Sequence, residues 1–329
     1  MLRPATTAAG FSLIELMIAM LLGLIVIGGV VSVFLANQQS YRTNEALSDV
    51  QDGSRIAFEM MAQDIRHAGL TGCDGSSDGN IINVLKASPG GGGTATWWAN
   101  WNNALIGYGS GDPAPLKATQ AVAGNDSLQL IGAAGAGLSV LTHTPATTLF
   151  TLNETSLDLQ KGDAMIVCDP DHAAIFQATD YDGAKAITYT TTTSTPGNYS
   201  SILSTTGIPY TYGANALIAK LTAVDWYIGA TPPPVVGGLS LYRVRLVNNT
   251  GILSTTTDEM VRNVTNMKIS YLQSGGTGFV PAAKVSTWSA VSAVQVTLKL
   301  QSTDQRAGTD VQPLTRSFTA TTTLRNRVN

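Results

Sequence analysis

Two overlapping motifs in one polar segment contain residue types that could support hydrolysis or metal binding. Residues 75–79, Gly-Ser-Ser-Asp-Gly, fit the G-x-S-x-G pattern of a serine nucleophile. Such a nucleophile needs a strand before it and a helix after it, whereas this segment follows a predicted helix. Residues 74–79 also resemble the start of a calcium loop, but Leu85 occupies the twelfth position, where a bidentate acid is required. We therefore predict no catalytic site, and only an incomplete calcium site remains as an alternative.

Little other material for cofactor chemistry is present in the 329 residues. The chain has two cysteines and three histidines, and the histidines show no metal-ligand spacing. Charged residues make up 12% of the chain, and the formal net charge is −3, which argues against nucleic-acid binding through a basic face. The 44% hydrophobic content argues against wholesale disorder. We predict a protein without catalytic activity, cofactor, metal or nucleic-acid partner.

An aromatic cluster lies among asparagine and glycine residues at Trp97, Trp98, Trp101 and Tyr108. Aromatic side chains dominate core burial, so we interpret the cluster as a small core under a long loop. The alternative is a contact for a partner protein or a sugar, because exposed apolar patches mark interfaces. We expect no glycan binding here, and the three tryptophans remain the candidate partner-contact residues.

The carboxylate of Glu15 is harder to explain, because it lies inside an apolar segment. Residues 11–36 contain no other charge, and as a helix they would be about 39 Å long, more than the hydrocarbon thickness of about 30 Å. A secretory signal has a shorter apolar core, so the segment predicts a membrane anchor, and Arg3 favours a cytoplasmic N-terminus. A carboxylate within the bilayer costs at least ~2.5–3.5 kcal/mol. Either Glu15 snorkels to the nearby interface, or another molecule supplies a balancing charge.

The position of Glu15 within its segment favours the second explanation. Residues 10–16 read Gly-Phe-Ser-Leu-Ile-Glu-Leu, and this segment resembles the type III signal sequence of type IV pilins and type II secretion pseudopilins. The resemblance implies that a prepilin peptidase cleaves after Gly10 and methylates the new N-terminus at Phe11. It also implies that Glu15 meets the N-terminal ammonium of a neighbouring subunit. Two buried opposite charges can offset each other where either alone would be costly.

The helical pattern continues beyond the anchor. Residues 37–68 lack proline, and small and apolar residues recur at helical spacing, with charged residues on the opposite face. We predict one helix from about Phe11 to about Ala68, stopped by Gly69 and Gly72. Its second half should pack on the globular part of the same chain. The anchor contains glycines but no proline. If the helix loosens when the subunit assembles, we therefore expect this to happen at the glycines.

From Thr71 onward, short apolar runs alternate with turn residues, which indicates antiparallel sheets. The predicted strands are Ile81–Leu85, Ser127–Ile131, Leu138–Leu141, Ala164–Val167, Ala174–Ala178, Ala216–Ala223, Leu239–Leu246, Met267–Tyr271, Val291–Leu300 and Arg316–Leu324. Residues 180–215 resemble nothing that we can place. The predicted fold class is α+β and type IV pilin-like, with a long N-terminal helix packed on a large antiparallel β-rich domain.

Several further stretches carry a more specific resemblance. They are Ser40–Arg42, Asp64–Gly69, Lys161–Asp163, His172–Thr179, Ser240–Arg243, Asn266–Lys268 and Thr323–Arg327. Together with the N-terminus they resemble the PilW family of minor pilins of the type IVa pilus. The implied organisation is a leader peptide at 1–10, a transmembrane and pilus-core helix at 11–36, its amphipathic continuation at 37–70, and a periplasmic or extracellular domain at 71–329.

The resemblance also implies a function. A minor pilin waits in the inner membrane with its N-terminus cytoplasmic, and then enters the pilus at the cell surface. It primes assembly at or near the tip and serves twitching motility and adhesion. The implied partners are the prepilin peptidase, other minor pilins, the major pilin and a tip adhesin. The alternatives are a minor pseudopilin of type II secretion, or a membrane-anchored glycan-binding or hydrolase domain.

The two cysteines, Cys73 and Cys168, would lie on the far side of the membrane from Arg3, where the compartment is oxidising. We therefore expect a disulfide between them. It would join the loop after the helix to a strand nearly a hundred residues later. Two free buried thiols are the alternative.

Overall fold

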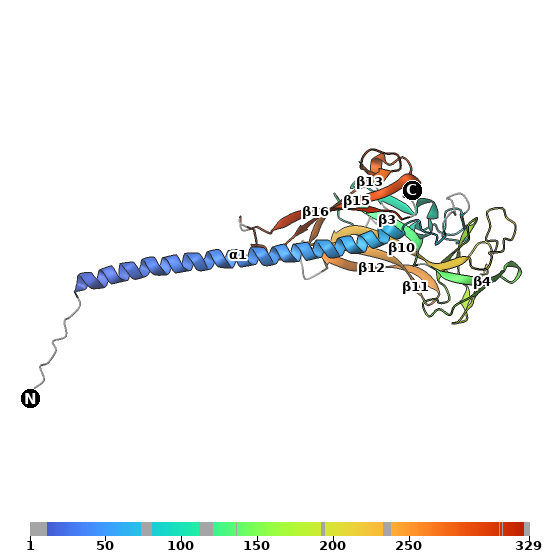
Figure 1. The fold of residues 1–329 in the computed structure, drawn as a ribbon, viewed down its shortest axis with the longest axis horizontal. Coiled ribbons are helices and arrows are strands. Elements are labelled where there is room, and N and C mark those ends of the chain that lie inside the picture. Colours follow the sequence, from blue (N-terminus) through green and yellow to red (C-terminus); the bar gives the residue numbers. More distant parts are fainter. Residues whose placement is uncertain are drawn as a thin grey trace, which may run out of the picture. The chain divides into compact units, whose positions relative to one another are not determined.

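One long helix, α1 (Leu13–His67), leads into a β-rich domain in the computed structural model (Figure 1). The structure describes residues 12–73, 81–111, 121–135, 137–191, 195–232, 238–308, 310 and 312–325. The chain divides into two units. The first comprises Met1–Gln51 and Ser302–Thr315, and the second comprises Asp52–Gln301 and Arg316–Asn329. The predicted continuous helix is confirmed over its described length, and it passes through Gly23, Gly28 and Gly29 without a break.

Sixteen strands are present in the described part of the chain, and they form a larger and a smaller sheet. In chain order they are β1 (Ile81–Asn83), β2 (Leu105–Tyr108), β3 (Ser127–Ala133), β4 (Leu138–Thr144), β5 (Leu149–Leu152), β6 (Ala164–Cys168), β7 (Ala173–Gln177), β8 (Asp180–Tyr181), β9 (Ala186–Thr188), β10 (Leu217–Ala230), β11 (Leu239–Asn249), β12 (Ile252–Arg262), β13 (Val264–Gln273), β14 (Val280–Pro281), β15 (Val291–Gln301) and β16 (Thr315–Thr323). Strands β1 and β7 pair in parallel, and the paired neighbours among β2 to β15 run antiparallel. The predicted α+β fold, with a helix packed on an antiparallel β-rich domain, is therefore confirmed.

Strand β10 is the hub of the larger sheet. Its first residues, from Leu217, pair with β4 and β6, and its later residues pair with β3 on one side and β11 on the other. Most of its side chains are buried, as expected for a strand covered on both faces. The smaller sheet has the order β14-β13-β15-β16. Asp126, just before β3, accepts the backbone N–H of Ile269 in β13 at 2.8 Å and so links the two sheets.

The second unit holds the last turns of α1 against both sheets (Figure 1). The buried face of this part of the helix comprises Ser54, Ala57, Met61 and Ile65. A Cβ added at Gly53 would lie 3.3 Å from Leu300 of β15 and 3.5 Å from Val261 of β12. The amphipathic pattern of the sequence therefore corresponds to a helix packed between sheets, where its apolar face is removed from water.

Glycine residues set the point at which α1 ends. Gly69 has φ 73°, a left-handed conformation that glycine adopts without steric cost, and its N–H donates to the carbonyl of Ile131 in β3 at 2.7 Å. A Cβ at Gly132 would collide with the carbonyl oxygen of His67. The end of the helix therefore lies directly on β3, and the predicted stop at Gly69 is confirmed.

Candidate functional site: the N-terminal helix and its anchorage

The N-terminal part of α1 presents its apolar side chains to the surroundings. Every large hydrophobic side chain from Leu13 to Leu35 is exposed in the described chain. By length and composition, α1 is the one described helix that could cross a membrane. Such a surface requires a lipid or protein environment, because exposed apolar area of this extent is unfavourable in water.

Glu15 lies in the first turn of this helix and takes part in its capping. Ser12 immediately precedes the helix, and its backbone N–H donates to Glu15 Oε2 at 3.2 Å. The carbonyl of Ser12 accepts the N–H of Leu16 at 3.2 Å. This is one half of a capping box, in which a glutamate at the third helical position satisfies the backbone N–H of the cap residue. Gly10 and Phe11, the predicted processing residues, lie outside the described residues.

The capping contact gives Glu15 a role within its own subunit, which our sequence reasoning did not include. The signal was present in the sequence, because Ser12-x-x-Glu15 has the capping-box spacing. A carboxylate in the first turn also interacts favourably with the helix dipole. Any test of Glu15 as a partner for a neighbouring subunit must therefore separate its charge from its hydrogen bond.

Beyond the apolar segment, the first unit places a loop against the helix. Nε2 of Gln39 lies 3.1 Å from the carbonyl oxygens of Arg306 and Gly308, and the hydroxyl of Thr43 donates to the carbonyl of Ala307 at 2.6 Å. Ala46 and Leu314 are buried in the same small cluster as Ala307. Polar side chains of the helix therefore satisfy the backbone carbonyls of Arg306, Ala307 and Gly308.

Within the second unit, Asp64 fastens the helix to the larger sheet. Its carboxylate accepts two hydrogen bonds from Arg243 of β11, at 2.7 and 2.9 Å, and one from the indole N–H of Trp226 in β10 at 2.9 Å. The Arg243 guanidinium also lies 5.8 Å from the centroid of the Trp226 ring. Burial raises the pKa of Asp64, and the Arg243 charge and hydrogen bonds offset this increase only in part.

We expect Asp64→Leu to lower the free energy of unfolding by about 2–3 kcal/mol, less than for a fully buried pair because Arg243 retains some exposure. The loss arises because the guanidinium is left without its partner. The double variant Asp64→Leu/Arg243→Leu should be more stable than Asp64→Leu. Urea unfolding of the full chain measures the stability of the two single variants and of the double variant. If the losses of stability in Asp64→Leu and Arg243→Leu simply add in the double variant, the two residues are not coupled.

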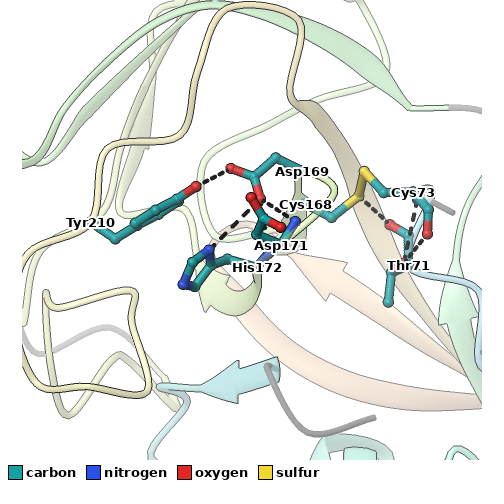
Figure 2. The surroundings of a disulfide bond; sticks show 7 residues. All are labelled: Thr71, Cys73, Cys168, Asp169, Asp171, His172 and Tyr210. Carbon is teal, nitrogen blue, oxygen red and sulfur yellow. Dashed lines mark hydrogen bonds and ion pairs between the residues drawn. A yellow bond between two sulfur atoms is a disulfide. The ribbon is translucent and has the colours of Figure 1, made fainter. Parts of the chain in front are cut away.

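A disulfide joins Cys73, six residues after the helix, to Cys168 at the end of β6 (Figure 2). Their Cα atoms are 5.9 Å apart. Cys168 is fully buried, and its Sγ lies 3.2 Å from the carbonyl oxygen of Thr71. The bond thus ties the segment that follows the helix to the interior of the larger sheet.

The turn after Cys168 is held by one carboxylate. Asp169 accepts the backbone N–H groups of Asp171 and His172 through Oδ1, at 3.1 and 2.8 Å, and the hydroxyl of Tyr210 through Oδ2 at 2.6 Å (Figure 2). The His172 ring lies against Tyr210, with ring centroids 3.9 Å apart and the ring planes tilted by 31°. Burial and the Asp169 carboxylate raise the pKa of Tyr210 to about 12. These contacts give Asp169 a structural role, because it fixes the turn that leads into β7.

His143 of β4 is buried in an aromatic cluster with Phe150, Tyr189 and Tyr212. Its ring stacks on Phe150 with centroids 3.9 Å apart. Nδ1 accepts the backbone N–H of Tyr212 at 3.1 Å, so the neutral ring carries its proton on Nε2, which lies 2.6 Å from the Tyr189 hydroxyl. A proton on Nδ1 would face the backbone N–H of Tyr212, so that two donors would point at each other. Burial lowers the pKa of His143 to about 4.

The lowered pKa of His143 predicts a loss of stability on acidification. The unfolded chain takes up the proton near pH 6.5 and the folded chain only near pH 4, so this contribution is full above pH 6.5 and declines as the pH falls to about 4. The expected loss is about 3 kcal/mol. Unfolding of the full chain at a series of pH values measures it. His143→Gln should flatten the profile in this window, and an unchanged slope would contradict the assignment.

The three candidate tryptophans lie in or beside two short 3-10 turns, η1 (Trp97–Ala99) and η2 (Trp101–Asn103). Trp98 is 5% exposed and belongs to a core cluster, and Trp97 and Trp101 pack against that cluster. Trp98 is therefore a core residue, as we interpreted the aromatic cluster, whereas Trp97 and Trp101 are only partly buried. The serine and calcium motifs of residues 74–79 lie outside the described residues, and the part of the chain that is described contains no group of three His, Cys, Asp or Glu residues arranged for a metal.

Comparison with known proteins adds one positive finding. Residues 6–31 match the family model described as the prokaryotic N-terminal methylation motif. No curated protein matches the chain. The matched segment includes the Gly10-Phe11 junction and Glu15, and it extends into the exposed apolar part of α1. The motif implies processing by a prepilin peptidase and, with the apolar helix, membrane anchoring before assembly. Proteins with this motif are generally structural rather than catalytic, and its presence supports a type IV pilin-like or pseudopilin protein.

Proposed function

We propose that the protein is a minor pilin that primes assembly of a type IV pilus and is incorporated at or near its tip. The observation that carries this proposal is the match to the methylation motif, with Glu15 as the sole charge of the apolar segment that follows Gly10. In this proposal, residues 1–10 are a leader, residues 11–36 enter the membrane and then the pilus core, residues 37–70 continue the helix, and residues 71–329 form the exported domain.

The size of the β-rich domain supports a position near the tip. It contains a 12-stranded sheet and a 4-stranded sheet. Such a domain suits a few copies at an end better than thousands along a shaft. The proposed partners are other minor pilins, the major pilin and a tip adhesin, with the inner membrane as the site before assembly and the cell surface as the site after it. The contacts are head-to-tail, as in open filaments.

Deletion of the gene tests this function against its nearest rival. A minor pilin predicts loss of surface pili and of twitching, with extracellular enzyme secretion unchanged. Restoration by the wild-type gene serves as the control. Loss of secretion with normal twitching would overturn the proposal in favour of a type II secretion pseudopilin.

A further inference from the structure

The smaller sheet ends in a long edge strand, β16, whose pairing with β15 is fixed by two contacts. The N–H of Leu324, just after β16, donates to the carbonyl of Ser292 in β15 at 2.9 Å. The hydroxyls of Thr319 and Thr297 are 2.9 Å apart. These contacts are equally spaced on the two strands and occur in opposite order. Strands β15 and β16 therefore pair antiparallel in a single register.

This register determines which backbone groups of β16 have no strand beside them. In an antiparallel pair, successive residues direct their N–H and C=O alternately toward the neighbouring strand and away from it. Since Leu324 bonds to β15, the residues that point away are Ser317, Thr319, Thr321 and Thr323. All four are exposed, and no other described strand lies beside β16. Their N–H and C=O groups therefore form an open edge in the described part of the chain.

The other outer strands of the described sheets carry features that prevent pairing. Strands β1, β2, β8 and β14 have four residues or fewer, and β14 contains Pro281. Strand β12 contains three charged residues and a bulge, and the N–H of its Leu253 already donates to the carbonyl of Thr195 at 3.1 Å. Short strands, charges, bulges and proline are the usual protection of sheet edges. Strand β16 has nine residues and, from Ser317 to Thr323, no charge, proline or glycine.

The side chains along this edge fit an uncharged strand. The four edge residues present hydroxyl groups on one face, and Phe318 and Ala320 are half-buried on the other. Hydroxyl side chains stabilise cross-strand pairs, as Thr297 and Thr319 already do within the sheet. In recognition by strand addition, main-chain hydrogen bonds supply affinity and alternate side chains supply specificity. A strand rich in hydroxyl and small apolar residues meets both requirements here.

The direction of β16 argues against pairing with a second copy of this chain. In this register Leu300 lies opposite Arg316 at the start of β16, and Leu300 is 3.3 Å from a Cβ added at Gly53 of α1. From there β16 extends alongside the helix toward the end of α1 (Figure 1). Strand and helix therefore run in the same direction. Antiparallel pairing of β16 with itself would point two helices in opposite directions, so both could not enter one membrane.

We propose that the open edge of β16 pairs with an uncharged edge strand of a different pilin-like subunit, so that a sheet continues from one subunit into the next. This inference rests on the proposed function and adds the surface through which a neighbouring subunit binds. The strand follows the loop that Gln39 and Thr43 hold on α1, directly beyond the apolar segment. Pairing at β16 would thus continue the contacts that the helices make in a filament.

A proline at an outward-facing position tests the proposal in the native host. Thr319→Pro removes one N–H from the open edge but none of the bonds to β15, and edge strands tolerate proline at such positions. We expect the ratio of protein in the sheared pilus fraction to protein in the membrane fraction to fall about tenfold, with the unfolding temperature of the purified full chain unchanged. Thr321→Pro should act alike and replaces Thr319→Pro if that variant does not fold.

Two matched controls separate the edge from other effects. Thr319→Val keeps the N–H and removes only the hydroxyl, so it should assemble as the wild type does. Thr257→Pro removes an outward N–H from the protected edge β12, because Thr257 has the same orientation as Leu253, and it should also assemble normally. Wild-type incorporation of the folded Thr319→Pro and Thr321→Pro variants would overturn the proposal. So would an equal loss in Thr257→Pro.

A photo-crosslinking amino acid in place of Thr321 identifies the neighbour. We expect its cross-linked peptide to come from a different protein that carries the N-terminal methylation motif, whichever filament that protein builds. Cross-links only to a second copy of this chain, or only to a protein without the motif, would overturn the proposal. Absence of the wild type from the pilus fraction, with the expected cross-link present, would instead contradict the proposed function.

Discussion

Exchange of Glu15 for glutamine is expected to remove the protein from assembled pili while leaving membrane insertion and processing intact. Glutamine retains the side-chain oxygen that accepts the N–H of Ser12, so the capping contact is preserved. It removes the charge that would balance the ammonium of a neighbouring subunit. Loss of one partner from a buried ion pair costs about 3–5 kcal/mol, or more than a hundredfold in incorporation.

The ratio of protein in the sheared pilus fraction to protein in the membrane fraction measures this effect. Glu15→Asp, which keeps the charge on a shorter side chain, is the matched control and should retain more incorporation than Glu15→Gln. Glu15→Ala removes both charge and cap. Wild-type incorporation of Glu15→Gln, together with a defect in Glu15→Ala, would show that the residue acts through capping alone.

Removal of the disulfide has the largest expected effect on the stability of the domain. Cys73 and Cys168 are separated by 95 residues, and the chain-entropy model gives about 4–5 kcal/mol for closing a loop of that length. We expect Cys73→Ser/Cys168→Ser to lose stability of this order, because its unfolded chain is less constrained. Denaturant unfolding of the full chain measures the loss.

Reduction of the wild type provides the matched control for this prediction. Reduced wild-type protein should unfold at the same denaturant concentration as the double variant, and the double variant should not respond to reductant. A stability difference below about 1 kcal/mol between oxidised and reduced wild type would contradict the prediction.

Local patterns predicted the helix and the principal strands well. Apolar residues at helical spacing identified the second half of α1, and the alternation of apolar and polar residues identified β15, because each element buries one face. Strand β12 was missed, since its stretch from Ser254 to Glu259 is polar on both faces and it pairs only with β11. In the structure, Thr250 and Gly251 have φ 50° and 97° and form a two-residue hairpin turn between β11 and β12. The glycine of this turn was the one signal of the hairpin that the sequence offered.

Contacts between distant residues could not be read from the sequence. Asp64 and Arg243 are 179 positions apart in the sequence, and no local pattern indicates that they meet. The cysteine pair was accessible by counting, because only two cysteines exist. The grouping of polar side chains around Trp97 was not accessible either, since Thr96 and Asn100 flank η1 whereas Tyr108 and Gln129 lie in β2 and β3.

The assembly role proposed for Glu15 depends on the removal of the leader, because only then does Phe11 provide the ammonium that Glu15 is proposed to meet. Mass spectrometry of the protein purified from its native host tests this directly. We predict a mature chain that begins at N-methylated Phe11, so that Glu15 is its fifth residue. A native chain that still begins at Met1, with residues 1–10 in place, would contradict the assembly role proposed for Glu15.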